Sequence, residues 1–411
     1  MLNKQKWLAI LVILTLIFTS VACSTSTPSP TKEENKDQVQ QEVKEPIKIG
    51  IVTSKSGALE AYGNQMLRGF ELGIEYATKG TKEIDGRKIE VIVEDSETVP
   101  EKAVEKATKL FEKDNIDILV GSASSGDALA ILPLAEEYQK VMIVEPAVAD
   151  SITGEAWNRY IFRTGRNSSQ DAVAGAVAIA KQGTKIAILA PDYAYGRDGA
   201  AAFKEAAEKL GAEIVLEEFP PANATDFTAS IQKIIDTAPD YLFVIWAGAN
   251  SPWKTIMDMK VKDKGIKIST GAPDIAALKT MTDFVGMEGF TVYYHKLPNN
   301  PVNDWLVTEH QKRYNEPPDL FTAGGMSSAL AIVEAIKKAG TTDTEALIST
   351  MEGMSFESPK GTMTFRKEDH QALQALYAIT LEKVDGVDYP VPTLIREMKP
   401  DELIPPIRNQ K

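Results

Sequence analysis

The chain has 411 residues, of which 43% are hydrophobic and 25% charged, as in an ordinary soluble globular protein of two or three domains. Its formal net charge is −13 and it has no block of basic residues, which argues against nucleic-acid binding, because phosphates require clustered Lys and Arg. The one cysteine excludes an internal disulfide. The three histidines lack metal-ligand spacing, so we expect no zinc site, whereas an all-carboxylate calcium site stays open.

The N-terminus has the pattern of a signal peptide, which we place at residues 1–22. Lys4 and Lys6 precede an apolar run of twelve residues, Trp7–Phe18, which is too short to span a bilayer. The segment Ser20-Val21-Ala22-Cys23 resembles a lipobox, although that pattern usually has Leu where Ser20 stands. The resemblance implies cleavage before Cys23 and a diacylglyceryl group on its sulfur. Loss of the two lysines would change the net charge from −13 to −15.

Residues 23–46 are expected to form a disordered tether. They are rich first in Ser, Thr and Pro and then in Lys, Glu and Gln, so they offer almost nothing to bury. A lipid on Cys23 and this tether would hold the folded body at the membrane surface, outside the cytoplasm. The alternative is an ordinary secreted protein with an unmodified cysteine.

From residue 47 onward, strand and helix patterns alternate. Short runs rich in β-branched residues predict strands, and apolar residues at helical spacing predict the helices between them. The first group of expected strands is 47–52, 88–93, 116–120 and 141–144, with helices at 64–77, 101–114 and 127–139. Repeated strand–helix–strand units indicate a parallel sheet with helices on both faces.

The same alternation restarts in a second group of similar size. Its expected strands are 185–189, 213–216, 241–245 and 266–269, with helices at 171–181, 196–210 and 226–236. We therefore predict an α/β protein with two doubly wound, Rossmann-like domains. Ligands bind at the carboxyl ends of strands in such sheets and between domains, so the loops after the strands are where function is expected.

These loops carry the residues by which the chain resembles a known family. The segments are 53–63, 121–126, 145–150, 191–196 and 246–250, and Thr225-Asp226-Phe227 opens a helix. In order, spacing and position at strand ends they are similar to type I periplasmic binding proteins, in the group that binds branched-chain amino acids for ABC importers. The resemblance covers roughly residues 47–385.

The resemblance implies two domains joined by three crossovers, near Thr164, His295 and Asp369. Domain one would comprise 47–164 plus 296–369, and domain two 165–295 plus 370–411. The implied function is a monomeric receptor without a cofactor. By hinge closure it would capture a small amino acid, branched-chain or otherwise hydrophobic, or a related carboxylate, and present it to an ABC permease.

The resemblance also assigns polar contacts to the ligand. Ser125 would hold the ligand carboxylate through its hydroxyl and backbone N–H at a helix N-terminus, although a serine there could equally be a helix cap. Ala147 would offer its carbonyl to a ligand ammonium. Ala149 stands where the family usually has Thr, so one hydrogen bond to the ligand is missing. Asp274 lies near the family's acidic residue that pairs with the ammonium.

Aromatic and small side chains complete the expected pocket. Tyr62 would line the cleft from the first domain, and Tyr195 and Trp246 from the second, although each ring could instead be packed structurally. Ala123 is small where the family often has a bulkier residue, which predicts a roomier pocket. Ser124 in the same loop is a further candidate for ligand contact.

No catalytic pattern competes with this interpretation. Ser124 and Ser125 lack the GxSxG context, no histidine lies in the strand-end loops of the first group, and no P-loop or GxGxxG follows the first strand. We therefore expect no enzymatic activity. Two alternatives stay open: a ligand sensor that acts through a separate signalling chain, and a structural lipoprotein with an empty cleft.

Overall fold

A computed structural model describes residues 44–247 and 250–409. The expected signal peptide, the lipid attachment at Cys23 and nearly all of the tether lie outside the described residues. Residues 44–411 form one compact unit, and the structure described below is the structure of that unit.

The first part of the unit is built on a six-stranded sheet with the strand order β2-β3-β1-β4-β5-β6. Its strands are parallel except β2, which pairs antiparallel with β3. The central strands β4 and β5 are buried at every residue, as expected where helices cover both faces. The strands are β1 (Ile47–Thr53), β2 (Glu83–Ile84), β3 (Arg87–Asp95), β4 (Ile118–Gly121), β5 (Val141–Val144) and β6 (Ile161–Arg163).

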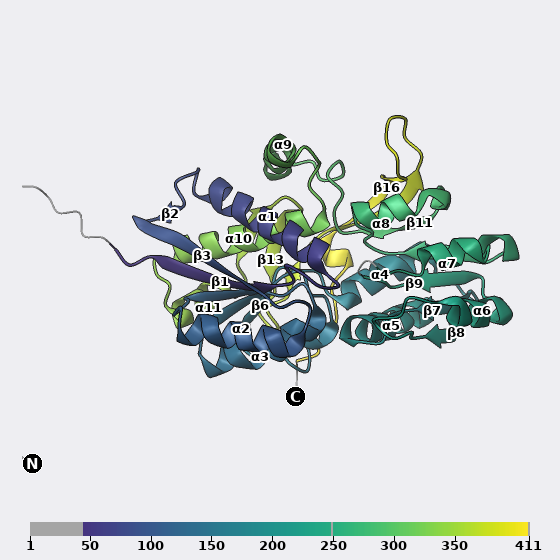
Figure 1. The fold of residues 1–411 in the computed structure, drawn as a ribbon, viewed down its shortest axis with the longest axis horizontal. Coiled ribbons are helices and arrows are strands. Elements are labelled where there is room, and N and C mark those ends of the chain that lie inside the picture. Colours follow the sequence, from purple (N-terminus) through teal and green to yellow (C-terminus); the bar gives the residue numbers. More distant parts are fainter. Residues whose placement is uncertain (1–43, 248–249, 410–411) are drawn as a thin grey trace, which may run out of the picture. The chain divides into compact units, whose positions relative to one another are not determined.

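Helices lie on both faces of this sheet (Figure 1). One face is covered by α1 and α10, which pack against each other, and the other by α2 and α3. We call this part the first lobe; it also includes α11 and a small antiparallel sheet, β12-β13-β14, next to α10. These elements are α1 (Glu60–Ala77), α2 (Pro100–Glu112), α3 (Ser125–Glu137), α10 (Leu320–Ala339), α11 (Thr344–Met351), β12 (Ser355–Ser358), β13 (Gly361–Phe365) and β14 (Ala372–Leu373).

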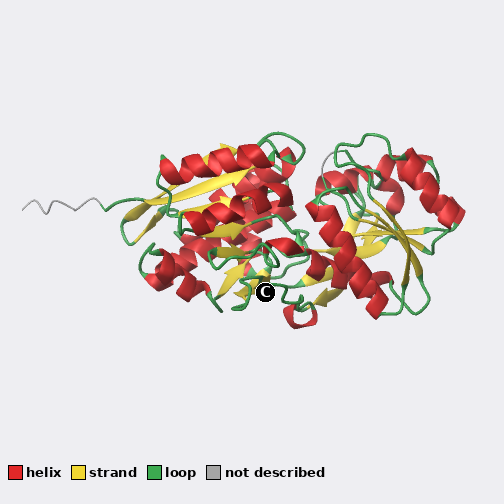
Figure 2. Ribbon diagram, turned by 90° about the horizontal axis from the view of Figure 1, so that it is seen from below, coloured by secondary structure: helices red, strands yellow, loops and turns green. Residues whose placement is uncertain are grey.

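The second lobe is built on a four-stranded parallel sheet of order β10-β9-β7-β8 and a three-stranded antiparallel sheet of order β11-β15-β16. A single bridge between Gly271 and Phe290 links the two sheets. Figure 2 shows the strands of the two lobes as separate groups, each flanked by helices. The strands are β7 (Lys185–Leu189), β8 (Glu213–Glu218), β9 (Tyr241–Val244), β10 (Lys267–Thr270), β11 (Glu288–Thr291), β15 (Leu376–Glu382) and β16 (Val391–Met398). The helices are α4 (Ser168–Ile179), α5 (Ala194–Lys209), α6 (Thr228–Thr237), α7 (Trp253–Asp258) and α8 (Ile275–Thr280).

The chain passes between the lobes in three places. These are residues 164–167 after β6, residues 292–300 between β11 and α9 (Pro301–Tyr314), and residues 374–375 between β14 and β15. The crossovers expected near Thr164, His295 and Asp369 lie in or close to these segments. The domain limits derived from the resemblance stay a prediction.

Helix α10 is long and apolar enough to resemble a membrane span. The apolar stretch of this helix is nevertheless 89% buried inside the unit. It packs against α1 and the sheet of the first lobe. Among the described residues, no other helix is both long enough and apolar enough to cross a membrane. The burial identifies α10 as the central core helix of the first lobe.

The crossing of α1 and α10 depends on glycines. A Cβ at Gly69 would lie 1.9 Å from the carbonyl oxygen of Thr322, and a Cβ at Gly325 would lie 2.0 Å from that of Met66. Both distances are far below van der Waals contact, and the opposing atoms are backbone, so only a separation of the two helices could relieve the overlap.

Replacing Gly325 by alanine is therefore expected to destabilise the protein by about 1–3 kcal/mol, because overpacking outweighs the better helix propensity of alanine. Chemical denaturation of residues 44–411 measures the loss. A matched control is Gly199→Ala in α5, where the added Cβ would meet side-chain atoms at 3.4 Å, an ordinary contact. Equal stability of Gly325→Ala and the wild type would show that the crossing adapts freely.

Candidate ligand-binding cleft

The candidate site is a cavity of about 50 Å³ between the two lobes. Its walls are segments that follow the carboxyl ends of strands in the parallel sheet of each lobe, together with the start of α10. This is the position where α/β sheets bind ligands, because helix N-termini and free backbone groups converge there. The lining residues are Leu59, Tyr62, Ala123, Ser125, Ala147, Val148, Arg166, Tyr193, Tyr195, Trp246, Ala247, Gly271, Ala272 and Phe321.

Six of the nine residues expected to contact a ligand line this cavity. They come from five different segments that follow strands, in both lobes, so tertiary folding brings them together. They are Tyr62, Ala123, Ser125, Ala147, Tyr195 and Trp246. The other three, Ser124, Ala149 and Asp274, lie elsewhere, and their contacts within the chain explain their positions.

The two adjacent serines have different partners. The hydroxyl of Ser124 accepts a hydrogen bond from the backbone N–H of Asp127 at 3.3 Å and caps α3. The hydroxyl of Ser125 accepts from the backbone N–H groups of Val148 at 3.3 Å and Ala149 at 3.2 Å. Helix capping, considered for Ser125, is therefore the role of Ser124. Neither bond uses the hydroxyl hydrogen of Ser125, which remains available to an acceptor in the cavity.

The loop after β5 is held from behind by a buried arginine. Arg163 is fully buried, and its Nη1 donates to the carbonyl of Ala149 at 2.6 Å while its Nε donates to Oε1 of Gln371 at 2.6 Å. Gln371 in turn donates to the carbonyl of Gly165 at 2.7 Å. Ala149 is thereby kept behind the cavity wall, whereas Ala147 lines it. This network joins the ligand loop to the first crossover segment.

Aromatic rings from both lobes form much of the wall. Tyr62 stacks on Phe321 with ring centroids 3.9 Å apart. On the opposite side, Tyr193 and Tyr195 stand at the beginning of α5 with centroids 5.8 Å apart. Trp246 is oriented by a hydrogen bond from Nε1 to the carbonyl of Asn250 at 2.5 Å. Such surfaces suit an apolar or aromatic ligand body.

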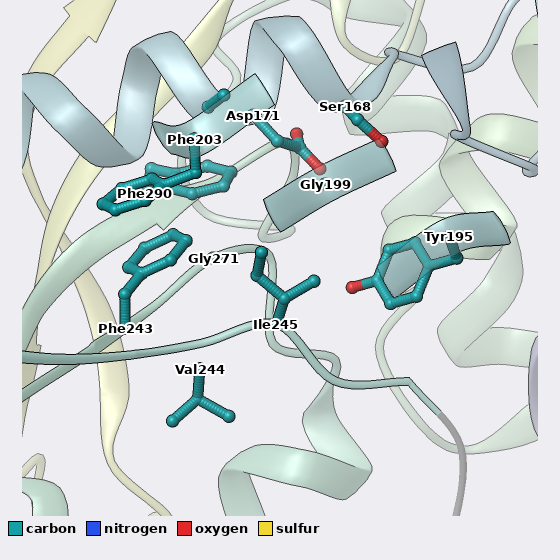
Figure 3. A pocket seen from close by; sticks show the side chains of 11 residues that line it. Ser168, Asp171, Tyr195, Gly199, Phe203, Phe243, Val244, Ile245, Gly271 and Phe290 are labelled. Carbon is teal, nitrogen blue, oxygen red and sulfur yellow. The ribbon is translucent and has the colours of Figure 1, made fainter. Parts of the chain in front are cut away.

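A second, smaller cavity lies behind Tyr195 inside the second lobe (Figure 3). It measures about 30 Å³, and Tyr195 and Gly271 line both cavities. Figure 3 shows the Tyr195 hydroxyl at one end and phenylalanine rings at the other, with Asp171 on a neighbouring wall. The Tyr195 side chain thus separates the cleft from this inner cavity. The phenylalanines are Phe203, Phe243 and Phe290.

Asp274 lies outside the deep cavity. It is buried, and its Oδ1 accepts the backbone N–H of Ala277 at 2.7 Å, so it caps α8. It lines a wider outer hollow of about 490 Å³, together with Tyr62 and Trp246. Trp253 is buried against Phe284 and reaches the same outer hollow.

Sequence reasoning missed Arg166, Tyr193 and Phe321. Tyr193 belongs to the same loop motif as Tyr195, and its spacing of two residues could have flagged it. Arg166 follows the predicted crossover at Thr164, and this segment was expected to be a hinge between the domains and not part of the cavity wall. Phe321 is the second residue of α10, beyond the region where strand and helix patterns were assigned.

Among the described residues, no three His, Cys, Asp or Glu side chains lie close enough together to hold a metal ion. The side chains around the cavity contribute aromatic surface, the hydroxyl of Ser125, tyrosine hydroxyls and one guanidinium. Backbone carbonyl and N–H groups are also present. Such a site can bind and enclose a small molecule.

Comparison with known proteins identifies the family. A family model described as "Periplasmic binding protein" matches residues 46–386. The chain belongs to this family. The predicted resemblance to its type I members and the predicted two-domain α/β fold are both confirmed. Family members are solute-binding proteins and not enzymes, and they act outside the cytoplasm.

Individual relatives extend over nearly the whole folded body. A solved ABC-type branched-chain amino acid transporter protein from Rhodopseudomonas palustris CGA009 is 53% identical, with a TM-score of 0.79 over 89% of this chain and 100% of that chain. A solute-binding protein from R. palustris BisB5, solved with 3,4-dihydroxybenzoic acid, is 29% identical, with a TM-score of 0.77 over 86% and 97%. The leucine-, isoleucine-, valine-, threonine- and alanine-binding protein of Pseudomonas aeruginosa is 25% identical over 78% of this chain and 86% of its own.

Proposed function

We propose that this periplasmic binding protein is the receptor of an ABC importer and closes its two lobes around a small carboxylate-bearing molecule. The observation that carries the proposal is the cavity whose walls come from strand-end loops of both lobes, with Ser125 on one side and Tyr195 and Trp246 on the other. A site divided in this way is complete only when the lobes are together, so binding and closure are coupled.

The first lobe would bind the ligand first. Ser125 is the first residue of α3, where free N–H groups and the helix dipole favour an anion, and its hydroxyl has a hydrogen to donate. Rotation about the three crossover segments would then bring Tyr195 and Trp246 over the ligand. Because closure buries polar atoms of the ligand, each atom without a partner lowers the affinity, which discriminates between ligands.

The relatives support a carboxylate as the shared feature. One relative is named for branched-chain and small amino acids, and another was solved with a dihydroxybenzoic acid. Both kinds of molecule carry a carboxylate and a compact apolar or aromatic body. Ser125, the start of α3 and the aromatic walls match these two parts.

Anchoring at the membrane is part of the proposal. The Ser20–Cys23 segment and the polar stretch after it support a lipid on Cys23 and a tether that keeps the receptor near its permease. Metabolic labelling with a fatty acid tests the anchor, and a Cys23→Ala variant should lose the label. That the receptor acts as a monomer stays a prediction.

A thermal-shift screen of residues 44–411 tests receptor function directly. The panel contains Leu, Ile, Val, Phe and small organic acids, including benzoate. A ligand at 100 times its dissociation constant is expected to stabilise the protein by about 2.7 kcal/mol. If neither the amino acids nor the organic acids raise the melting temperature, the proposal of a small-carboxylate receptor fails.

A further inference from the structure

Arg166 is the only charged residue among the described residues that line the cavity between the lobes, which we call the deep cavity. Residues 248 and 249, which follow Ala247 in the sequence and lie outside the described residues, are Gly and Ala and carry no charge. Arg166 is only 8% exposed, so its charge is held inside the protein beside the cavity. A buried charge requires a partner, because the desolvation cost is otherwise uncompensated.

Part of the Arg166 guanidinium is already paired. Nε donates to Oδ1 of Asp171 at 3.2 Å. Within the described part of the chain, its terminal nitrogens make no hydrogen bond. A guanidinium binds a carboxylate best through two parallel N–H groups. The terminal nitrogens are therefore free for an anion in the cavity.

Two helices add to the positive potential. The first residue of α3, Ser125, lines the cavity from the first lobe, and Tyr193 and Tyr195 at the start of α5 line it from the second. These helices have 13 and 16 residues, long enough to present free N–H groups and a dipole at their N-termini. With Arg166, they place N–H donors on three sides of the cavity.

Among the described residues that line the deep cavity, none is an Asp or Glu that could pair with an ammonium. Asp274 caps α8 and lines the outer hollow, and Ala149 has no hydroxyl and lies behind the wall. Asp171 lines the inner cavity beyond Tyr195 and is paired with Arg166. An α-ammonium would meet the Ala147 backbone and a nearby arginine, so its loss of hydration would be poorly compensated.

We infer that Arg166 binds the ligand's carboxylate and that the preferred ligand is an aromatic or apolar carboxylate without an ammonium group. The inference rests on the proposed receptor function. It narrows the ligand class from carboxylates in general to carboxylates with a net negative charge, which excludes zwitterionic amino acids. Ser125 and the α3 N-terminus hold the carboxylate from the first lobe, and Arg166 holds it from the crossover segment. The Tyr62, Tyr195 and Trp246 rings enclose the apolar body.

Matched ligand pairs test the ligand class. Phenylalanine and 3-phenylpropionate differ only by the amino group, as do leucine and 4-methylpentanoate. Calorimetry on the wild-type protein is expected to show the amino-free member binding at least about tenfold more tightly in one or both pairs, because the ammonium loses its hydration without a carboxylate partner. Equal or tighter binding of leucine and phenylalanine would overturn the inference and leave the receptor function intact. Absence of binding by both members of both pairs would instead count against the proposed function.

Variants of Arg166 test its role separately from folding. Arg166→Gln keeps N–H donors and removes the charge, and the double variant Arg166→Gln/Asp171→Asn also removes the carboxylate left unpaired. Both are expected to lose about 10- to 100-fold in affinity for the amino-free acid and to lose the preference for it over the amino acid. The control is Arg197→Gln on exposed α5 surface, where Arg197 pairs with Asp192. A merely structural arginine would lower the melting temperature without changing the preference ratio, and that outcome would overturn the assignment.

Discussion

Ligand affinity is expected to rise as the pH falls from about 7 to 5, because closure brings two buried carboxylates together. Asp319 caps α10 of the first lobe, and its Oδ2 accepts the backbone N–H of Ile275 at 2.7 Å. Ile275 is the first residue of α8 in the second lobe and follows Asp274 directly. The side chains of Asp319 and Asp274 are 6% and 4% exposed. The hydrogen bond between Asp319 and Ile275 joins the two lobes across the cleft.

With the lobes in contact at this point, as they are in this structure, a protonated Asp319 is favoured. Burial, and after it the charge of Asp274, raises the pKa of Asp319 to about 7, although the N–H groups of Ile275 and Leu320 lower it. Burial also raises the pKa of Asp274. When the lobes separate, water returns to both groups and the pKa falls toward the ordinary value of about 3.9. Between the two pKa values, Asp319 is protonated when the lobes are closed and ionised when they are open, so closure takes up a proton. Lowering the pH below 7 therefore favours closure. Above about pH 8 Asp319 is ionised in both forms, and the affinity no longer depends on pH.

The expected slope is at most about tenfold in affinity per pH unit between pH 7 and 5, since one proton is taken up on closure. Titration calorimetry over pH 5 to 8 measures it with a ligand whose carboxylate stays ionised throughout. Other groups near Asp319 are Glu316, Tyr293 and Tyr294, and both tyrosines have raised pKa values, so they stay neutral in this range. His295 also stays neutral, because burial lowers its pKa to about 4.

Asp319→Asn imitates the protonated acid and is expected to flatten the profile at a level close to that of the wild type at pH 5. Glu316→Gln is the matched control, since Glu316 is exposed and paired with Arg68, and it should leave the slope in place. A wild-type affinity that is independent of pH would show that the two carboxylates do not approach each other in the ligand-bound form.

Adjacent serine variants are expected to separate ligand binding from helix capping. Ser125→Ala removes a hydrogen bond to a charged group, which typically contributes about 1.5–3 kcal/mol, so ligand affinity should fall about 10- to 100-fold. Ser124→Ala removes the cap of α3 and should lower stability by about 0.5–2 kcal/mol. Its effect on affinity should be small, because the Ser124 side chain does not line the cavity.

Both serine variants lower stability to some degree, because Ser125 also accepts from the buried N–H groups of Val148 and Ala149. Affinity therefore decides between the roles. Calorimetry at a temperature where both variants are fully folded gives the comparison. A larger loss of affinity in Ser124→Ala than in Ser125→Ala would reverse the assignment made from the hydrogen bonds.

Local periodicity predicted the parallel strands well. The strands expected at 141–144 and 185–189 coincide with β5 and β7. These strands are short, largely apolar runs, a pattern that depends only on neighbours in the chain. The elements after residue 270 were not assigned from the sequence. The core helix α10 is buried along nearly its whole length, so it shows no polar face by which its period could be recognised.

The sequence by itself determined the α/β alternation and, through its resemblance to the family, pointed to six residues that line the cavity. These residues follow strands, and strand-end loops converge at one edge of a parallel sheet wherever the strands pair. Only the tertiary structure decided which serine caps α3, that Asp274 faces Asp319 and not the deep cavity, and that Arg166 is the charge beside it. These facts depend on the approach of segments far apart in the chain. No local pattern encodes that approach, since it is set by how the lobes pack and by which buried polar groups find partners.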